Sequence, residues 1–474
     1  MGLRSVLLKG ASVLTAGQMT AQLLMFVRNI ILARMLTPED MGIAATFAIT
    51  ISLLEMTSNL GVEMLLVQAL DGDDPRLQAA AHLFEVIRGL LIGGIILASA
   101  PIIARMFDTP QALWAFQYVA IVPVLRGFMH LDWKRVQRNM TFIPSVIVEI
   151  APQAIITLAA WPMVVWLRDY SAVLWLVIIQ AAIALLASQL VAERNYQLNW
   201  SRVHASRLLA FGWPLLINGL LMFGVFQGDR LIVGTAYSMA ELGVYSVAFA
   251  LVMMIAMTVS KLASALLLPL FSSVQEEPAT MRRYFLLSVQ VLALLGGLIA
   301  LPLLIIGGDL IVMIYGEQYT SATEFIAWLG VLIAFRIFRL GPTIAALARG
   351  DSKNSMIANM FRTIGVLGAV VVAWLGLPLS SIIICGIVGE ILALMAAVWR
   401  LLRLHGMPVS DSITAPVLVS TILLIAGIVN VLGWTEAGVA VRIAVSATLI
   451  LALMVMAVLL LGLPKSDTTT HKFL

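Results

Sequence analysis

The chain consists mainly of apolar runs of about 20 residues or more, each long enough to cross a bilayer as a helix. Of the 474 residues, 61% are hydrophobic and only 11% are charged. A soluble domain carries about 25% charged residues. Because water cannot solvate such a surface, we expect a multi-span membrane protein. The strands of a β-barrel are short and alternate in polarity, unlike these runs, so the predicted fold is all-α.

The apolar runs predict about fourteen transmembrane helices. Their approximate bounds are 11–36, 41–66, 79–106, 111–130, 142–166, 171–192, 208–235, 241–270, 284–306, 323–347, 355–375, 379–401, 413–433 and 438–462. Lys and Arg in the loops set the orientation. With the N-terminus in the cytoplasm, 17 of them lie at cytoplasmic ends and three (Arg34, Arg105 and Arg168) at outer ends. This bias predicts an even number of spans and cytoplasmic N- and C-termini.

A basic, polar segment at residues 193–207 divides the predicted spans. We expect residues 1–192 to form an N-terminal six-helix lobe and residues 208–403 a C-terminal six-helix lobe. Residues 404–474 then hold two additional helices and a short cytoplasmic tail. Because six is even, both lobes insert the same way up, as parallel repeats do in some transporters.

A helical hairpin at residues 28–63 joins two apolar runs through a tight polar turn. In that turn Thr37 can cap the second helix, Pro38 suits its first turn, and Asp40 suits the positive end of its dipole. The hairpin recurs at an offset of 201 residues, which aligns Gly42 with Gly243, Thr37 with Ser238, Asp40 with Glu241, Ala33 with Gly234 and Arg28 with Asp229. These matches indicate an internal duplication, although similar composition alone is the alternative explanation.

Several cations lie within the predicted spans, where ionisable groups are costly and by default indicate a functional site. The deeper ones are Arg28, Arg88, Arg230, Lys261 and Arg336. We predict that they line a central cavity and bind an anionic substrate; structural ion pairs are the alternative. Others, namely Arg126, Arg339, Arg362 and Arg442, lie nearer the span ends, where snorkelling to the interface explains them.

Buried carboxylates are the candidates for binding a coupling ion, and the three chosen are Glu55, Glu63 and Glu390. Glu55 and Glu63 share a polar stripe with Ser52 and Asn59, which predicts one face of one continuous helix over residues 41–66. Glu390 lies mid-span. For each, the alternative is a structural role as the partner of a nearby Arg.

The sequence motifs of several other classes of protein are absent from the chain. The chain has no P-loop motif and no H-E-x-x-H motif, its five His are scattered, and its one cysteine, Cys385, cannot form a disulfide within the chain. We therefore expect no metal and no cofactor. The net charge of +4 comes mainly from loop Lys and Arg and requires no nucleic-acid partner. Outer loops are too short for a large catalytic face, so we expect a secondary-type transporter and not an enzyme.

Two stretches, RNIILARMLTPEDMGIAATFAI and GDRLIVGTAYSMAELGVYSVAFAL, resemble the polysaccharide-exporter branch of the multidrug/oligosaccharidyl-lipid/polysaccharide (MOP) superfamily. The matching positions are Arg28, Leu32, Ala33, Arg34, Leu36, Thr37, Pro38, Asp40 and Gly42, then Asp229, Arg230, Val233 and Gly234. Length and span number look most similar to exopolysaccharide flippases of the colanic-acid or teichuronic-acid kind.

This resemblance implies two six-helix lobes around a central cavity. It implies that an undecaprenyl-pyrophosphate-linked oligosaccharide moves across the bacterial inner membrane, for exopolysaccharide or O-antigen-type biosynthesis. Polysaccharide polymerase and chain-length proteins would be candidate partners, and an ion gradient the energy source. Two alternatives stay open. A multidrug cation exporter would favour a net acidic cavity with aromatic walls, and a membrane-embedded polymerase or transferase would need a clustered acid/base pair near one interface.

Overall fold

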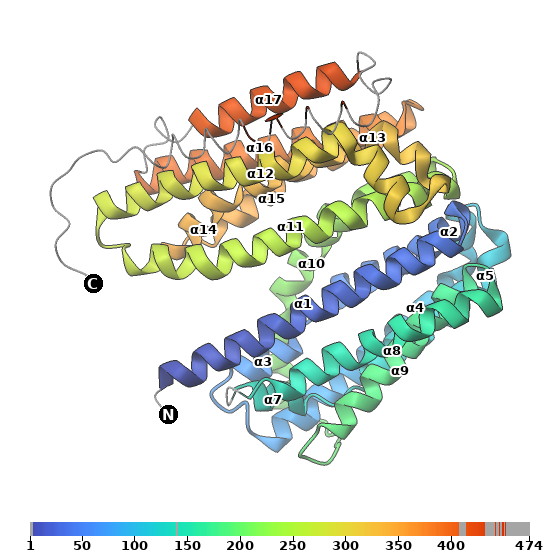
Figure 1. Cartoon of the computed structure of the whole chain (residues 1–474). Helices are drawn as coiled ribbons and strands as arrows, with labels where there is room; N and C mark the ends of the chain where they lie inside the picture. Colours follow the sequence, from blue (N-terminus) through green and yellow to red (C-terminus); the bar gives the residue numbers. More distant parts are fainter. Residues whose placement is uncertain are drawn as a thin grey trace. The chain divides into compact units, whose positions relative to one another are not determined.

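The computed structural model describes residues 3–138, 141–406 and 414–431, together with positions 441, 445, 448, 449 and 451. Every regular element among these residues is a helix (Figure 1), which confirms the all-α prediction. In chain order the elements are α1 (Leu3–Met35), α2 (Pro38–Ser58), α3 (Val62–Gln68), α4 (Pro75–Met106), η1 (Pro110–Ala112), α5 (Leu113–Val119), α6 (Ile121–Gly127), α7 (Asp132–Arg138), α8 (Ile143–Leu167), α9 (Ser171–Leu190), α10 (Arg202–Ala236), α11 (Met239–Ser273), α12 (Pro278–Tyr315), η2 (Glu317–Ala322), α13 (Thr323–Phe338), α14 (Leu340–Ala348), α15 (Lys353–Trp374), α16 (Leu379–His405) and α17 (Thr414–Val431).

The described part of the chain holds many helices that could cross a membrane. Ten are long and apolar enough, or up to 11 if the bent segment from η1 to α7 is one span. This confirms a polytopic membrane protein, while the count of fourteen stays a prediction. The last predicted span, 438–462, lies almost wholly outside the described residues, and so does Arg442.

The chain divides into two compact units. Unit 1 comprises Met1–Leu251, Ile314–Tyr319 and Ala373–Gly376, and unit 2 comprises Val252–Met313, Thr320–Val372 and Leu377–Leu474. The division into two six-helix lobes stays a prediction.

The second predicted span is not one continuous helix. In the structure α2 ends at Ser58, and α3 begins at Val62. Between them Gly61 adopts a left-handed conformation with φ of 63°, which glycine reaches at little cost. The Asn59 side chain accepts a hydrogen bond from the Gly61 N–H at 2.8 Å and stabilises this break. The prediction that Glu55 and Glu63 lie on one face of one helix was therefore wrong.

The two aligned hairpins share the same helix caps in unit 1. Before α2, the Thr37 hydroxyl accepts the Asp40 N–H at 3.1 Å, and the Asp40 carboxylate accepts the Thr37 N–H at 3.3 Å. Before α11, Ser238 and Glu241 make the same reciprocal bonds, at 3.2 and 3.0 Å. Such capping boxes satisfy backbone donors that the first helical turn leaves free. The position-by-position match supports the predicted duplication.

The N-terminal turns of α2 and α11 also pack directly against each other. A Cβ added at Gly42 would overlap the carbonyl oxygen of Met239, and one added at Gly243 would overlap that of Pro38. Pro38 and Met239 are themselves 201 residues apart, so the contact is reciprocal. Only residues without a side chain allow the two backbones to approach this closely.

A short segment from later in the chain, Ile314–Tyr319, belongs to unit 1 and holds the end of α1. The Gln318 amide donates to the carbonyl oxygens of Ala33 and Leu36. Arg34 Nε donates to the Ile314 carbonyl at 2.7 Å. The last carbonyls of a helix have no partner within the helix, so the two Gln318 bonds complete the C-terminus of α1. The Arg34 bond fixes the segment to the same helix end.

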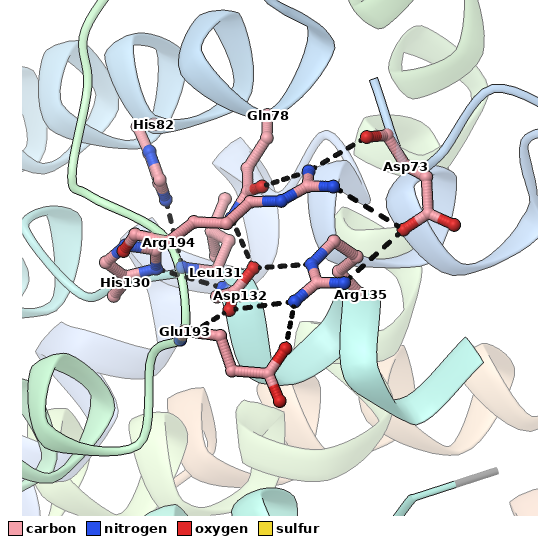
Figure 2. Close-up of polar contacts among 9 residues, drawn as sticks. All are labelled: Asp73, Gln78, His82, His130, Leu131, Asp132, Arg135, Glu193 and Arg194. Carbon is pink, nitrogen blue, oxygen red and sulfur yellow. Dashed lines mark hydrogen bonds and ion pairs between the residues drawn. The ribbon is translucent and has the colours of Figure 1, made fainter. Parts of the chain in front are cut away.

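The linker between α9 and α10 is docked on unit 1 by a buried polar cluster, which Figure 2 shows. Its centre is Asp132, which is fully buried at the start of α7. The Asp132 carboxylate accepts hydrogen bonds from Arg135 Nε at 2.7 Å, from the Gln78 amide at 3.1 Å and from the Glu193 N–H at 2.8 Å. Arg194 adds a bond to the Asp73 carbonyl at 2.8 Å. The predicted linker is thus fixed to α4 and α7 where it begins.

Two histidine rings extend this docking (Figure 2). His82 Nδ1 donates to the Gln197 carbonyl at 3.1 Å, and its Nε2 accepts the Leu131 N–H at 3.0 Å. His130 Nε2 donates to the Arg194 carbonyl at 3.0 Å, and its Nδ1 accepts the Asp132 N–H at 3.1 Å. A ring that donates from one nitrogen and accepts at the other is a neutral imidazole. Both histidines therefore serve as structural ties and not as metal ligands.

Candidate functional site

A cavity of about 330 Å³, here called cavity A, lies within unit 1. Side chains from α1, α2, α6, α9, α10 and α11 line it, together with the last residue of α12. The polar and ionisable ones among them are Arg28, Asn29, Ser52, Glu55, Arg126, Gln180, Arg230, Ser246 and Tyr315. Two of the five predicted substrate-binding cations, Arg28 and Arg230, therefore share one cavity, together with the coupling candidate Glu55.

The guanidinium groups of Arg28 and Arg230 are held by neutral neighbours. Arg28 Nη1 donates to the Gln180 side chain at 3.4 Å, and Gln180 in turn donates to Gln153 at 3.2 Å. Arg230 lies over the ring of Phe249, with its Cζ atom 4.8 Å from the ring centroid. Among the residues described, neither guanidinium has a carboxylate within 4.0 Å. Both are therefore charged groups held in place with their charge uncompensated.

The neighbouring carboxylate of Asp229 does not neutralise Arg230. It accepts the Tyr245 hydroxyl at 2.6 Å and the Arg230 backbone N–H at 2.9 Å. Tyr245 lies on the next helix, α11. The guanidinium of Arg230 stays available to the cavity.

A third cation borders cavity A, and sequence reasoning had set it aside. Arg126 Nη1 lies 2.6 and 2.8 Å from the two carboxylate oxygens of Glu55. The interpretation of Arg126 as a snorkelling residue at a span end was wrong, because its side chain pairs with α2 and lines the cavity. No sequence pattern near Arg126 indicates this partner, which lies 71 residues away.

A second cavity of about 500 Å³, here called cavity B, also lies within unit 1. Arg88, a predicted substrate-binding residue, and Glu63, a coupling candidate, line it. Arg88 pairs with Glu85 at 2.7 Å, and Glu63 pairs with Lys134 at 2.9 Å. Glu55 and Arg126 border cavity B as well as cavity A, so this ion pair separates the two.

The sequence comparison decides the family. A family model described as polysaccharide biosynthesis protein matches residues 31–324, more than half of the chain. The chain belongs to this family. The matched region includes most of unit 1, with every residue that lines cavity B and every residue that lines cavity A except Arg28 and Asn29.

Similar proteins agree with this family. Over 358 residues the chain is 19% identical to the teichuronic acid biosynthesis protein TuaB of Bacillus subtilis (strain 168), covering 73% of this chain and 71% of that protein. Its fold resembles the lipid II flippase MurJ in an inward closed conformation, with a TM-score of 0.70, 12% identity and coverage of 95% and 99% of the two chains. It also resembles an inward-facing multidrug resistance MATE family transporter of the MOP superfamily, with a TM-score of 0.64, 13% identity and coverage of 82% and 95%. The family match confirms the predicted resemblance to polysaccharide-biosynthesis proteins, and the two solved structures show that the chain shares their fold.

Two of the predicted site cations belong to unit 2, and neither is among the residues that line the two cavities. Lys261, on α11, is exposed in the structure. Arg336, on α13, donates from Nε to Glu390 at 2.7 Å. Of the five predicted substrate-binding cations, Arg28 and Arg230 therefore line cavity A, and Arg88 lines cavity B. A joint role for all five stays a prediction.

Glu390 is fully buried on α16 and is surrounded by arginines. Its carboxylate lies 2.7 Å from Arg336 Nε, 3.0 Å from Arg362 Nε and 3.4 Å from Arg339 Nε. The interpretation of Arg339 and Arg362 as snorkelling residues was therefore wrong. Three guanidinium groups around one carboxylate form a buried ion-pair network that joins α13, α15 and α16. This geometry supports the structural alternative for Glu390 over proton exchange.

We expect the Glu390→Gln variant to lose a large part of its stability, because three buried guanidinium groups would face a neutral amide. Removing one partner of a buried ion pair costs about 3–5 kcal/mol. The measurement is the thermal unfolding of the detergent-purified variant. The matched control is Glu63→Gln, whose side chain is 48% exposed beside Lys134 and should change stability by about 0–1 kcal/mol. A Glu390→Gln protein as stable as wild type would rule out the structural role.

Proposed function

We propose that this protein is a flippase for a lipid-linked oligosaccharide. The substrate is an undecaprenyl-pyrophosphate-linked glycan, moved from the cytoplasmic to the outer leaflet of the bacterial inner membrane. Both termini lie in the cytoplasm, as the distribution of loop Lys and Arg predicts. The observation that carries the proposal is the pair of uncompensated guanidinium groups, Arg28 and Arg230, in cavity A.

The physical problem of flipping explains why such a cavity is needed. A pyrophosphate cannot cross a hydrocarbon core unaided, since desolvating its charge costs many kcal/mol. Arg is suited to binding phosphate, because its planar group donates several hydrogen bonds in a fixed geometry. Arg28 and Arg230 are each held by a neutral contact and can turn their remaining donors to a ligand. The lipid tail can stay in the bilayer while the head group moves.

The alternatives fit this cavity less well. A multidrug resistance transporter shares the fold, as the MATE family neighbour shows. However, Arg28, Arg126 and Arg230 outnumber the single carboxylate of Glu55 in cavity A, which repels a cation. A polymerase or transferase needs an acid/base pair free to act on a substrate. The carboxylates of Glu55 and Glu63 are both held in ion pairs instead.

The proposed function is tested by reconstituting the full chain in proteoliposomes with a fluorescent undecaprenyl-pyrophosphate-linked oligosaccharide. We expect the protein to move the head group between leaflets, which a membrane-impermeant quencher or glycosidase detects. An organic dye cation should not be transported. Movement of the cation but not of the glycolipid would reverse the assignment in favour of multidrug efflux.

We also propose that an ion gradient drives this movement, with Glu55 and Glu63 as the coupling candidates in unit 1. In the same vesicles, an imposed pH or sodium gradient should raise the initial rate severalfold. Glu55→Gln should remove that dependence, since an amide cannot exchange a proton or release Arg126 in response to one. A rate that ignores both gradients would refute coupling. A response unaffected by Gln at either position would show that other carboxylates couple.

A further inference from the structure

We propose that cavity B binds a neutral sugar of the glycan, adjoining the pyrophosphate in cavity A. This inference rests on the proposed function and deepens it, by assigning a second part of the substrate to a second part of unit 1. At about 500 and 330 Å³, both cavities fall within the usual range of small-molecule sites, roughly 300–1,000 Å³.

The charge of cavity B indicates a neutral ligand. Its cations are Arg88, Arg126 and Lys134, and its anions are Glu55, Glu63 and Glu85. Three ion pairs join them, at 2.7 Å for Arg88 and Glu85, 2.6 Å for Arg126 and Glu55, and 2.9 Å for Lys134 and Glu63. An anion entering this cavity meets no net opposite charge. Cavity A, in contrast, has an excess of guanidinium groups.

The same lining suits the hydroxyl groups of a sugar. Carboxylates only accept hydrogen bonds, whereas Arg and Lys only donate them, and a hydroxyl does both. Asn59 and Gln137 add neutral donors and acceptors, and Met64, Met129 and Leu131 add apolar surface for the C–H faces of a ring. Mixed polar groups on an apolar wall are typical of a pocket that orients a small ligand.

The order of the two cavities matches the order of groups along the proposed substrate. Glu55 and Arg126 border both cavities, so a ligand that passes this pair can occupy both. In an undecaprenyl-pyrophosphate-linked glycan, the first sugar is bonded directly to the pyrophosphate. A pyrophosphate at Arg28 and Arg230 thus leaves the sugar to extend past Arg126 toward α3 and α7.

The test is equilibrium binding to the detergent-purified full chain by five probes. The first is undecaprenyl pyrophosphate without a sugar, and the others carry glucose, galactose, N-acetylglucosamine or glucuronate. We expect at least one neutral sugar to tighten binding about tenfold over the sugar-free lipid. Met64→Trp, which narrows cavity B, and Gln137→Leu, which removes a polar group from it, should abolish this gain. Both should leave binding of the sugar-free lipid unchanged.

The control is Met360→Trp on α15, since Met360 and Met64 are equally exposed, at 55% and 56%. This variant should keep the full sugar gain. Cavity B is excluded as the sugar site if the neutral sugars add nothing, if both cavity variants keep the gain, or if glucuronate binds tightest. In all three cases the sugar-free lipid still binds and the proposed function survives. If the sugar-free lipid itself fails to bind, the proposed function falls and this inference with it.

Discussion

Replacing Arg28 by Gln is expected to weaken binding of undecaprenyl pyrophosphate roughly 10- to 100-fold. Arg28 lines cavity A with no carboxylate partner among the described residues, so its charge is available to a phosphate. Hydrogen bonds to charged groups contribute about 1.5–3 kcal/mol each, and about 1.4 kcal/mol corresponds to a factor of ten in Kd. Arg230→Gln should behave in the same way. The measurement is equilibrium binding to the purified protein, followed by flipping in proteoliposomes.

The control for this prediction is Arg105→Gln, which removes the same charge from an exposed position near the end of α4. It should leave binding and flipping unchanged. If Arg28→Gln and Arg230→Gln both bind the lipid as tightly as wild type, cavity A does not hold the pyrophosphate. Equal losses in all three variants would indicate a general effect of net charge instead.

Adding a single methyl group at Gly42 or at Gly243 is expected to prevent proper packing of unit 1. In each case the new Cβ would overlap a backbone carbonyl of the other hairpin, and a backbone cannot move aside as a flexible side chain can. Overpacking typically costs about 1–3 kcal/mol, and these contacts belong at the upper end of that range. Gly42→Ala and Gly243→Ala should both lower the melting temperature and the yield of folded protein.

A glycine elsewhere in the same unit gives the matched control. Gly94 lies within α4, and a Cβ there would meet nothing within 4 Å. Gly94→Ala should keep or slightly raise stability, because alanine favours a helix over glycine by about 1 kcal/mol. Melting temperatures for the Gly42 and Gly243 variants equal to that of Gly94→Ala would show that the hairpins do not pack as closely as described.

The parts of the fold and site that depend on local sequence could be predicted. Long apolar runs establish an all-α membrane protein, and the residues of the turn at Thr37 fix a capping box that recurs at Ser238. Arg28 and Arg230 were chosen because charge is costly in a membrane, and both line cavity A. These inferences depend only on the sequence of a residue's own span or on its immediate neighbours in the chain.

The parts that depend on distant partners could not be predicted. Arg126 is partnered by Glu55, which lies 71 residues away, and Arg362 by Glu390 on the following helix. Position within a span was therefore a poor guide to these two arginines, whose side chains were wrongly interpreted as snorkelling to the interface. The break at Gly61 had a visible signal, since Asn followed closely by Gly often interrupts a helix. In the prediction, the helical periodicity of the polar stripe was given more weight than this Asn and Gly signal.

The charged residues of the two aligned hairpins do not fall at equivalent positions. This difference affects which ligands cavity A can accept. At the offset of 201 residues Arg28 corresponds to Asp229, while Arg230 corresponds to Asn29. The two uncompensated guanidinium groups of the cavity therefore come from non-equivalent positions, and the Asp229 carboxylate is held by Tyr245. A wall built from equivalent positions would present the same surface to a ligand turned end for end. This wall does not. Under the proposed function it would therefore distinguish the two ends of an asymmetric substrate and hold it in a single polarity.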